Sequence, residues 1–265
     1  MQIYLAVTPE ASQEAAGHCR NLAHVAYRVG PESVLLRQGL LLQTRGGLLS
    51  VSDHEAPFID NPEGLRDAVL RECGRRNYSG VLLDFEEAPR RDRRAFAAAL
   101  APALSASRRT LYLPEGYAKN VPGAVALLCT AVSGGSFSQY LQDAVSQAGG
   151  AGRPGGGLRL ALDVQRLRMD FRLPARSGEG EPLTAEALAA LMERESPAVF
   201  FSQDLCARYF TYSRDGEAHF VLFDDADTLN RKLRLGAGMG FGAAFFMWPE
   251  VRDIAPRLFA PWRTR

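Results

Sequence analysis

Two carboxylic acids with alternating spacing, Asp84 and Glu86, follow a short apolar run in segment 78–87. Residues 80–83 are typical of a buried parallel strand, which is a nearly continuous apolar run. Side chains alternate along a strand, so both acids should point to one side, with Cα atoms about 6.5 Å apart. Because two neighbouring carboxylates disfavour joint ionisation, one of them can keep its proton near neutral pH. Such an acid could protonate a glycosidic oxygen.

The same residues also have a purely structural interpretation. Acidic residues often end a strand because a helix follows. Pro89 fits the first turn of such a helix, and acidic side chains favour a helix N-terminus. The spacing alone leaves both interpretations open.

The rest of the chain predicts the element that positions these acids. Strand-like runs alternate with helical patterns through most of the 265 residues, and this alternation is typical of an α/β protein. The predicted strands are 3–7, 24–29, 48–52, 78–87, 110–113, 125–130, 158–163 and 242–248. We therefore expect a (β/α)8 TIM barrel that spans residues 1–265 as a single domain.

One interruption of this alternation is visible near the C-terminus. Residues 209–212 and 219–223 are aromatic and apolar, and Asp215-Gly216 lies between them. This pattern indicates a hairpin. We expect a small hairpin insertion at about residues 205–224, before the last helix.

Composition limits the possible partners and cofactors. The net charge of +1 gives no basic field for nucleic acid or a membrane surface. The four cysteines lack Cys-x-x-Cys spacing and the four histidines lack metal-ligand spacing, so we expect free thiols, no metal and no cofactor. The chain begins with a strand rather than a leader, and it has no apolar run of about 18 residues. These features predict a cytoplasmic protein.

The segment around the two acids resembles a known enzyme family. The residues Gly-Val-Leu-Leu-Asp-Phe-Glu at 80–86 resemble the Asp-Gly-x-Asp-x-Asp-x-Glu strand of glycoside hydrolase family 18, the chitinase-like family. They are most similar to its bacterial spore-germination and cortex-lytic N-acetylglucosaminidase branch, where Gly-Val-Asn-Ile-Asp-Phe-Glu is typical. The resemblance implies that Glu86 is the catalytic acid and Asp84 its assisting aspartate. Leu82 and Ser79 replace the family's other two aspartates.

A second match lies near the C-terminus. The residues Val-Leu-Phe-Asp-Asp-Ala at 221–226 and the run 242–248 resemble the branch's Val-Trp-Phe-Glu-Asp-Ala and Gly-Ile-x-Tyr-Trp phrases. The resemblance implies that Trp248 forms the floor of the −1 sugar site, since aromatic faces suit sugar C–H groups. Core packing is the alternative for a tryptophan at a strand end.

The sequence departs from the family at its sixth strand. Where the family has Met-x-Tyr-Asp, which contacts the substrate acetamide and the sugar, this chain has Cys-Thr-Ala-Val, with Ala131 and Val132 in place of the Tyr and the Asp. Neighbouring loops offer Tyr117, Glu115, Tyr140 and Asp163 as substrate-binding residues that could compensate.

Two functions from different classes are consistent with these observations. The resemblance implies a retaining glycosidase for N-acetylglucosamine-containing glycans, such as peptidoglycan of the spore cortex or chitin, in which the substrate's own acetamide oxygen is the nucleophile. The missing Tyr and Asp favour the alternative of an inactive barrel that binds carbohydrate or is associated with sporulation. An unrelated barrel enzyme for a phosphorylated metabolite would need a phosphate-binding glycine motif after the seventh strand, and the sequence has none there. The glycine-rich segment 149–157 precedes a strand, and no Gly-Lys-Ser/Thr follows it.

Overall fold

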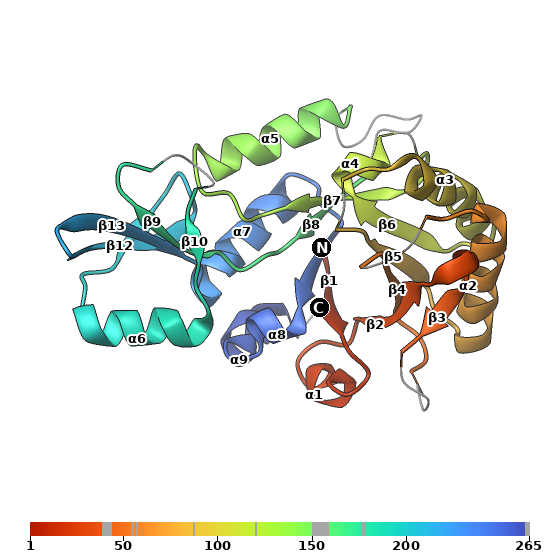
Figure 1. Cartoon of the computed structure of the whole chain (residues 1–265), viewed down its shortest axis with the longest axis horizontal. Helices are drawn as coiled ribbons and strands as arrows, with labels where there is room; N and C mark the ends of the chain where they lie inside the picture. Colours follow the sequence, from red (N-terminus) through yellow and green to blue (C-terminus); the bar gives the residue numbers. More distant parts are fainter. Residues whose placement is uncertain are drawn as a thin grey trace.

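The structure is a computed structural model that describes residues 1–38, 44–54, 56, 58–86, 88–119, 121–149, 159–175 and 179–262. Its centre is a closed eight-stranded parallel barrel, which confirms the predicted TIM barrel (Figure 1). The barrel strands are β1 (Gln2–Val7), β2 (Leu22–Val29), β4 (Leu48–Ser52), β5 (Gly80–Asp84), β6 (Thr110–Pro114), β7 (Val125–Cys129), β8 (Arg159–Asp163) and β14 (Ala243–Met247). Pairing of β1 with both β2 and β14 closes the ring.

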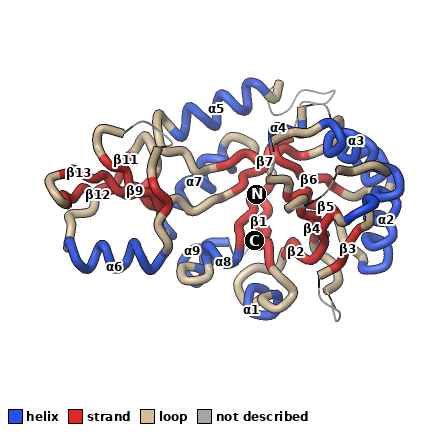
Figure 2. Tube along the Cα trace, in the orientation of Figure 1, coloured by secondary structure: helices blue, strands red, loops and turns tan. Residues whose placement is uncertain are grey.

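Helices cover the outside of this barrel, as Figure 2 shows in blue. The helices are α1 (Ser12–Ala16), α2 (Pro62–Arg76), α3 (Arg91–Ala106), α4 (Glu115–Ala118), α5 (Phe137–Gln147), α7 (Ala226–Gly238), α8 (Trp248–Val251) and α9 (Ala255–Phe259). Short 3-10 turns lie at Pro31–Ser33 and Ala260–Trp262, and the short strand β3 (Leu35–Arg37) pairs antiparallel with β2. The Asn61 side chain caps α2 by accepting from the Gly64 backbone N–H at 2.9 Å.

The alternation of side chains along β5 decides what faces the barrel interior. Leu82 packs inside with Tyr112 and Phe245, whereas Leu83 and Phe85 pack outside against the helices. The rings of Tyr112 and Phe245 lie 4.9 Å apart and fill the interior. Asp84 follows Leu82 in the inward register. Its carboxyl group therefore lies next to these apolar interior side chains, at the C-terminal mouth of the barrel.

The insertion is larger than the predicted hairpin. The hairpin itself is present as β12 (Ala207–Arg214) and β13 (Glu217–Phe223), with left-handed Asp215 and Gly216 at its turn. It belongs to a five-stranded antiparallel sheet in the order β10-β9-β13-β12-β11. The other members are β9 (Arg168–Arg172), β10 (Glu181–Pro182) and β11 (Phe200–Ser202), and α6 (Ala185–Glu195) packs on the sheet. Local patterns missed β9 because it is short, rich in charge and paired with a strand far along the chain.

The two ends of the insertion meet at the barrel. The Asp224 backbone N–H donates to the Leu167 carbonyl at 2.7 Å, and the Leu167 N–H donates to Asp224 Oδ2 at 3.1 Å. The insertion sheet and α6 therefore extend to one side of the barrel from a narrow base (Figure 1).

Other sequence-based expectations concern cysteines, metals and membranes. Cys19, Cys73, Cys129 and Cys206 are all free. Across the described ranges, no helix has the length and apolar character to cross a membrane, and no group of three or more His, Cys, Asp or Glu side chains is arranged to hold a metal. Most of the glycine-rich segment 149–157 lies outside the described residues.

Candidate active site

The carboxyl group of Asp84 is the centre of an acidic cluster at the barrel mouth. Burial, with a smaller contribution from the nearby charges of Glu86, Asp163 and Asp53, raises the pKa of Asp84 from 3.8 to about 6. The pair expected from the strand alternation therefore contains one carboxyl group that is half protonated near pH 6.

Asp163 faces the same mouth from the end of β8. Its inward register matches that of Cys129, its partner at the end of β7. Burial raises the pKa of Asp163, while a hydrogen bond from Gln165 Nε2 to its Oδ2 at 2.9 Å opposes that rise. Because the charge of Asp163 acts on Asp84, acids from opposite parts of the sequence share one electrostatic environment.

Tyr140 and Glu115 lie on the β7 side of this cluster. The Tyr140 hydroxyl donates to the Cys129 carbonyl at 3.0 Å. Burial raises the pKa of Tyr140 to about 12, and the charges of Cys129, Glu115 and Asp163 contribute to the rise. Three of the four residues proposed to compensate for Ala131 and Val132 are thus brought together next to β7.

Glu86 extends from the cluster into solvent. Its side chain is 66% exposed, and its Oε2 lies 3.8 Å from His54 Nδ1. Its backbone is fixed by a hydrogen bond, because the Glu86 N–H donates to Oδ1 of the fully buried Asp53 at 3.0 Å. An exposed carboxyl group on a fixed backbone can contact a ligand that covers the barrel mouth.

A buried arginine fixes Asp53 in turn. Arg93 of α3 is fully buried, and its Nε donates to Asp53 Oδ2 at 3.5 Å. Arg93 also pairs with Asp92 and donates from Nη2 to the Ala56 carbonyl at 3.0 Å. This network joins the ends of β4 and β5 to the first turn of α3, and it positions Glu86 through Asp53.

The helix-capping interpretation of the two acids is not what the structure shows. The N-cap of α3 is Arg90, which forms no side-chain cap bond. The acid in the first turn of the helix is Asp92, which accepts from the Ile59 N–H at 2.9 Å. Asp84 and Glu86 face the mouth instead.

Two predicted substrate-binding residues lie in the apolar layer outside the barrel. Trp248 is 2% exposed and packs with Ala244 and Phe246, because the strand alternation turns it away from the interior. Met247 takes the inward place and is 40% exposed. The structure thus differs from the expected sugar-binding floor and agrees with the core-packing alternative for Trp248.

Tyr117 is likewise buried, with 3% exposure. Its ring packs edge-on against Phe85 at 5.3 Å, and its hydroxyl donates to the Ala88 carbonyl at 3.3 Å. Both contacts support the segment that follows β5 from outside. The structure does not bring Tyr117 to the acidic cluster.

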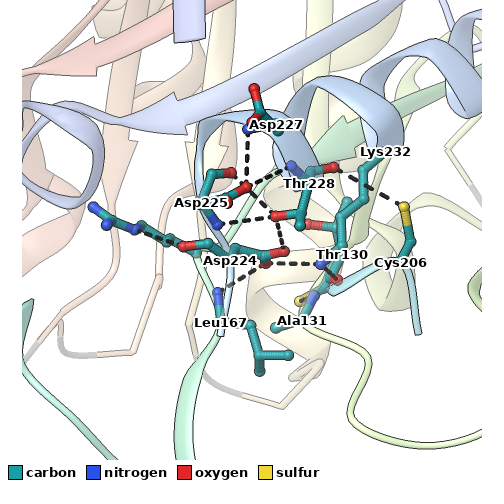
Figure 3. Close-up of polar contacts among 11 residues, drawn as sticks. Thr130, Ala131, Leu167, Cys206, Asp224, Asp225, Asp227, Thr228 and Lys232 are labelled. Carbon is teal, nitrogen blue, oxygen red and sulfur yellow. Dashed lines mark hydrogen bonds and ion pairs between the residues drawn. The ribbon is translucent and has the colours of Figure 1, made fainter. Parts of the chain in front are cut away.

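Segment 129–132, where the sequence departs from the pattern of glycoside hydrolase family 18, contacts a buried ion pair that is shown in Figure 3. Lys232 of α7 donates to Asp224 Oδ2 at 2.8 Å and to the Thr130 carbonyl at 3.3 Å, and both charged side chains are fully buried. Thr228 donates to the other carboxylate oxygen of Asp224 at 2.8 Å. This contact set joins the end of β7, the base of the insertion and α7.

The residues that position the site were not predicted from the sequence. Asp53 follows β4 as Asp84 ends the neighbouring β5, and carboxyl ends of adjacent parallel strands meet at one edge. Lys232 lies next to the apolar Leu229 and Leu233 of α7 in the sequence, which indicated that it is buried. Because isolated charges are rarely buried, a buried Lys232 also needs an acidic partner. These two signals were present in the sequence.

The fold and the acidic mouth define a (β/α)8 barrel with a cluster of carboxyl groups at the C-terminal ends of its strands. No protein family and no curated protein matches the chain. Among solved structures it is similar to a chitinase from Chromobacterium violaceum, with 15% identity, 100% of each chain covered and a TM-score of 0.66. The spore cortex-lytic enzyme SleL from Bacillus megaterium is similar with 15% identity, over 97% of this chain and 74% of that one, at a TM-score of 0.64. These similarities establish the fold.

Asp84 should lower stability at neutral pH. An acid with a higher pKa in the folded chain binds its proton more tightly there, so its ionisation costs stability as the pH rises from about 4 to about 6. We expect Asp84→Asn to stabilise the protein by about 1–3 kcal/mol at pH 8 and by much less at pH 4. Denaturant unfolding at both pH values measures the difference. A gain that is equal at both pH values, or equal to that of the exposed Asp60→Asn control, would contradict this expectation.

Proposed function

We propose that the protein is a glycoside hydrolase of the family 18 type that cleaves N-acetylglucosamine-containing glycans, such as spore-cortex peptidoglycan or chitin. One observation carries the proposal: Asp84, with its pKa raised to about 6, lies at the mouth beside the exposed Glu86. The fold similarity to chitinases and SleL supports the same class.

In the proposed reaction Glu86 gives its proton to the glycosidic oxygen as the bond from that oxygen to the anomeric carbon breaks. The acetamide oxygen of the substrate forms the new bond to that carbon, so no second protein nucleophile is needed. Glu86 then takes a proton from the water that opens this intermediate. Asp84 in its protonated form donates a hydrogen bond that orients the acetamide.

The β7 side of the cluster supplies polar groups in place of the missing Tyr and Asp. Asp163 and Tyr140 lie there with Glu115, and each lies at the end of a barrel strand or on the helix that follows one. In the proposal these groups contact the sugar at the −1 site. The Tyr140 hydroxyl donates its hydrogen bond to the Cys129 carbonyl, and in the proposal its lone pairs accept from a donor group of the substrate.

A binding protein without catalysis is the second candidate. Two observations favour it: Ala131 and Val132 replace the family's acetamide-contacting residues, and Trp248 is buried at 2% exposure. In this proposal the same mouth holds a glycan chain without cleaving it, as part of a sporulation-associated protein.

The decisive experiment incubates the full chain with N-acetylglucosamine oligomers and with purified spore-cortex peptidoglycan between pH 5 and 8, followed by mass spectrometry. The glycosidase proposal expects shorter oligosaccharides. Saturable binding without cleavage supports the binding protein instead. If the protein neither cleaves nor binds either glycan, both proposals are rejected.

The location of the protein is part of the same proposal. We propose a cytoplasmic protein that becomes associated with the spore, supported by the fold similarity to a spore cortex-lytic enzyme. Detection with a specific antibody in purified spores, compared with vegetative cytoplasm, tests it. A signal confined to the culture medium would overturn it.

A further inference from the structure

A pocket lies on the outer side of α7, away from the acidic mouth. A pocket of about 360 Å³ opens between α7, α9 and the β11–β12 edge of the insertion. Four arginines from three elements line it: Arg208, Arg231, Arg234 and Arg257. Its volume falls within the range of small-molecule sites, which is roughly 300–1,000 Å³.

Two of these guanidinium groups are held by carboxylates at the start of α7. Arg208 Nε donates to Asp225 Oδ2 at 3.0 Å, and Arg257 Nη2 donates to Asp227 Oδ2 at 3.1 Å. Each contact orders a guanidinium group but uses few of its five N–H donors. The ion pairs therefore fix two arginines and leave donors that can face the pocket.

The other two arginines have no carboxylate partner among the described residues. Arg231 stacks over the ring of Phe201, with 4.7 Å between Cζ and the ring centroid, and Arg208 lies over the same ring at 5.9 Å. Stacking orders the Arg231 guanidinium without neutralising its charge. Arg234 forms no hydrogen bond or ion pair within the described ranges. The pocket thus holds two uncompensated positive charges.

The uncharged wall of the pocket also offers donors. Asn230 is 6% exposed, and its Oδ1 accepts from Trp262 Nε1 at 2.8 Å. Because an indole N–H can only donate, the amide orientation is fixed, and Nδ2 is the group left for a ligand. The Thr228 hydroxyl is occupied by Asp224 and Asp225.

We propose that this pocket binds an oxyanion, a phosphoryl or carboxylate group carried by a small molecule. Guanidinium groups recognise both kinds of oxyanion by paired hydrogen bonds. The excess of arginine over carboxylate and the donor group of Asn230 distinguish the pocket from a surface ion-pair network. The proposal is independent of the glycosidase proposal, because no lining residue belongs to the acidic mouth.

Isothermal titration calorimetry of the full chain with pyrophosphate and, separately, with citrate at low ionic strength tests the proposal. We expect at least one of them to bind, with an affinity that falls as salt is added. Binding of pyrophosphate alone assigns a phosphoryl ligand, and binding of citrate alone assigns a carboxylate. The double variant Arg231→Gln/Arg234→Gln should bind about 10-fold or more weakly, since each change removes charge-assisted hydrogen bonds.

The matched control is Arg94→Gln, which removes one exposed arginine from α3 on another side of the barrel. It should leave the affinity unchanged, and circular dichroism should show that all variants are folded. Arg231 and Arg234 are exposed, so their replacement leaves the core intact. No binding of either anion at millimolar concentration, or equal binding by wild type and the double variant, would overturn the proposal.

Discussion

Glu86→Gln is expected to reduce glycan hydrolysis by roughly 10²–10⁴-fold, which is the usual contribution of a general acid. Glutamine keeps the size and hydrogen-bonding reach of the side chain but has no proton to transfer. The backbone should stay in place, because Asp53 binds the N–H of residue 86 and not its side chain. Oligosaccharide affinity should therefore persist while turnover is lost. Rates come from mass spectrometry of products, and affinity comes from calorimetry.

The matched control is Glu63→Gln, which makes the same chemical change at an exposed position of α2. Its turnover should equal that of the wild type. Wild-type turnover that survives Glu86→Gln undiminished would eliminate the proposed acid. If wild type binds glycans without cleaving them, the same variant should change affinity modestly at most, as expected for the binding-protein candidate.

Lys232→Met is expected to destabilise the protein by about 3–5 kcal/mol, because removal of one partner leaves a buried charge uncompensated. Among the described residues, Asp224 would lose the only cation that pairs with its carboxylate. The Thr130 carbonyl would lose the hydrogen bond that it accepts from Lys232. Methionine fills similar volume, so the loss comes from charge and not from a cavity. The midpoint of thermal unfolding should fall by about 6–20 °C.

The chain contains one other lysine, Lys119, which is exposed. Lys119→Met is therefore a control with the same chemistry, and its unfolding midpoint should stay within a degree or two of the wild type, since surface changes stay within about 0.5 kcal/mol. Equal effects of the two variants would show that the buried pair contributes nothing to stability.

The barrel was predictable because its strands are local apolar runs. Segment 80–83 and the acids after it carry enough information to place Asp84 at the mouth, since strand alternation fixes its direction. The β12–β13 turn was predictable for a similar reason, because Asp215 and Gly216 both tolerate the left-handed backbone that they adopt.

Features that depend on contacts far along the chain were not predictable. β9 becomes a strand only through pairing with β13, and Arg93 becomes a buried residue only because Asp53 and Asp92 surround it. Trp248 illustrates a different limit. A shift of one residue at a strand end moves a side chain from the interior to the outer layer, and the sequence does not fix that register.

The closed base of the insertion has a consequence for evolution and engineering. Since Leu167 and Asp224 are hydrogen-bonded neighbours, the chain leaves and re-enters the barrel at one point. Segments whose ends adjoin can be gained, lost or exchanged as units. A chimaera that replaces residues 168–223 with a short turn should keep the barrel, provided that Asp224 stays to pair with Lys232 and that an apolar side chain replaces Cys206 in the cluster beside α7. On this expectation the insertion can be exchanged as a unit, whereas the ion pair between Asp224 and Lys232 at its base is part of the barrel.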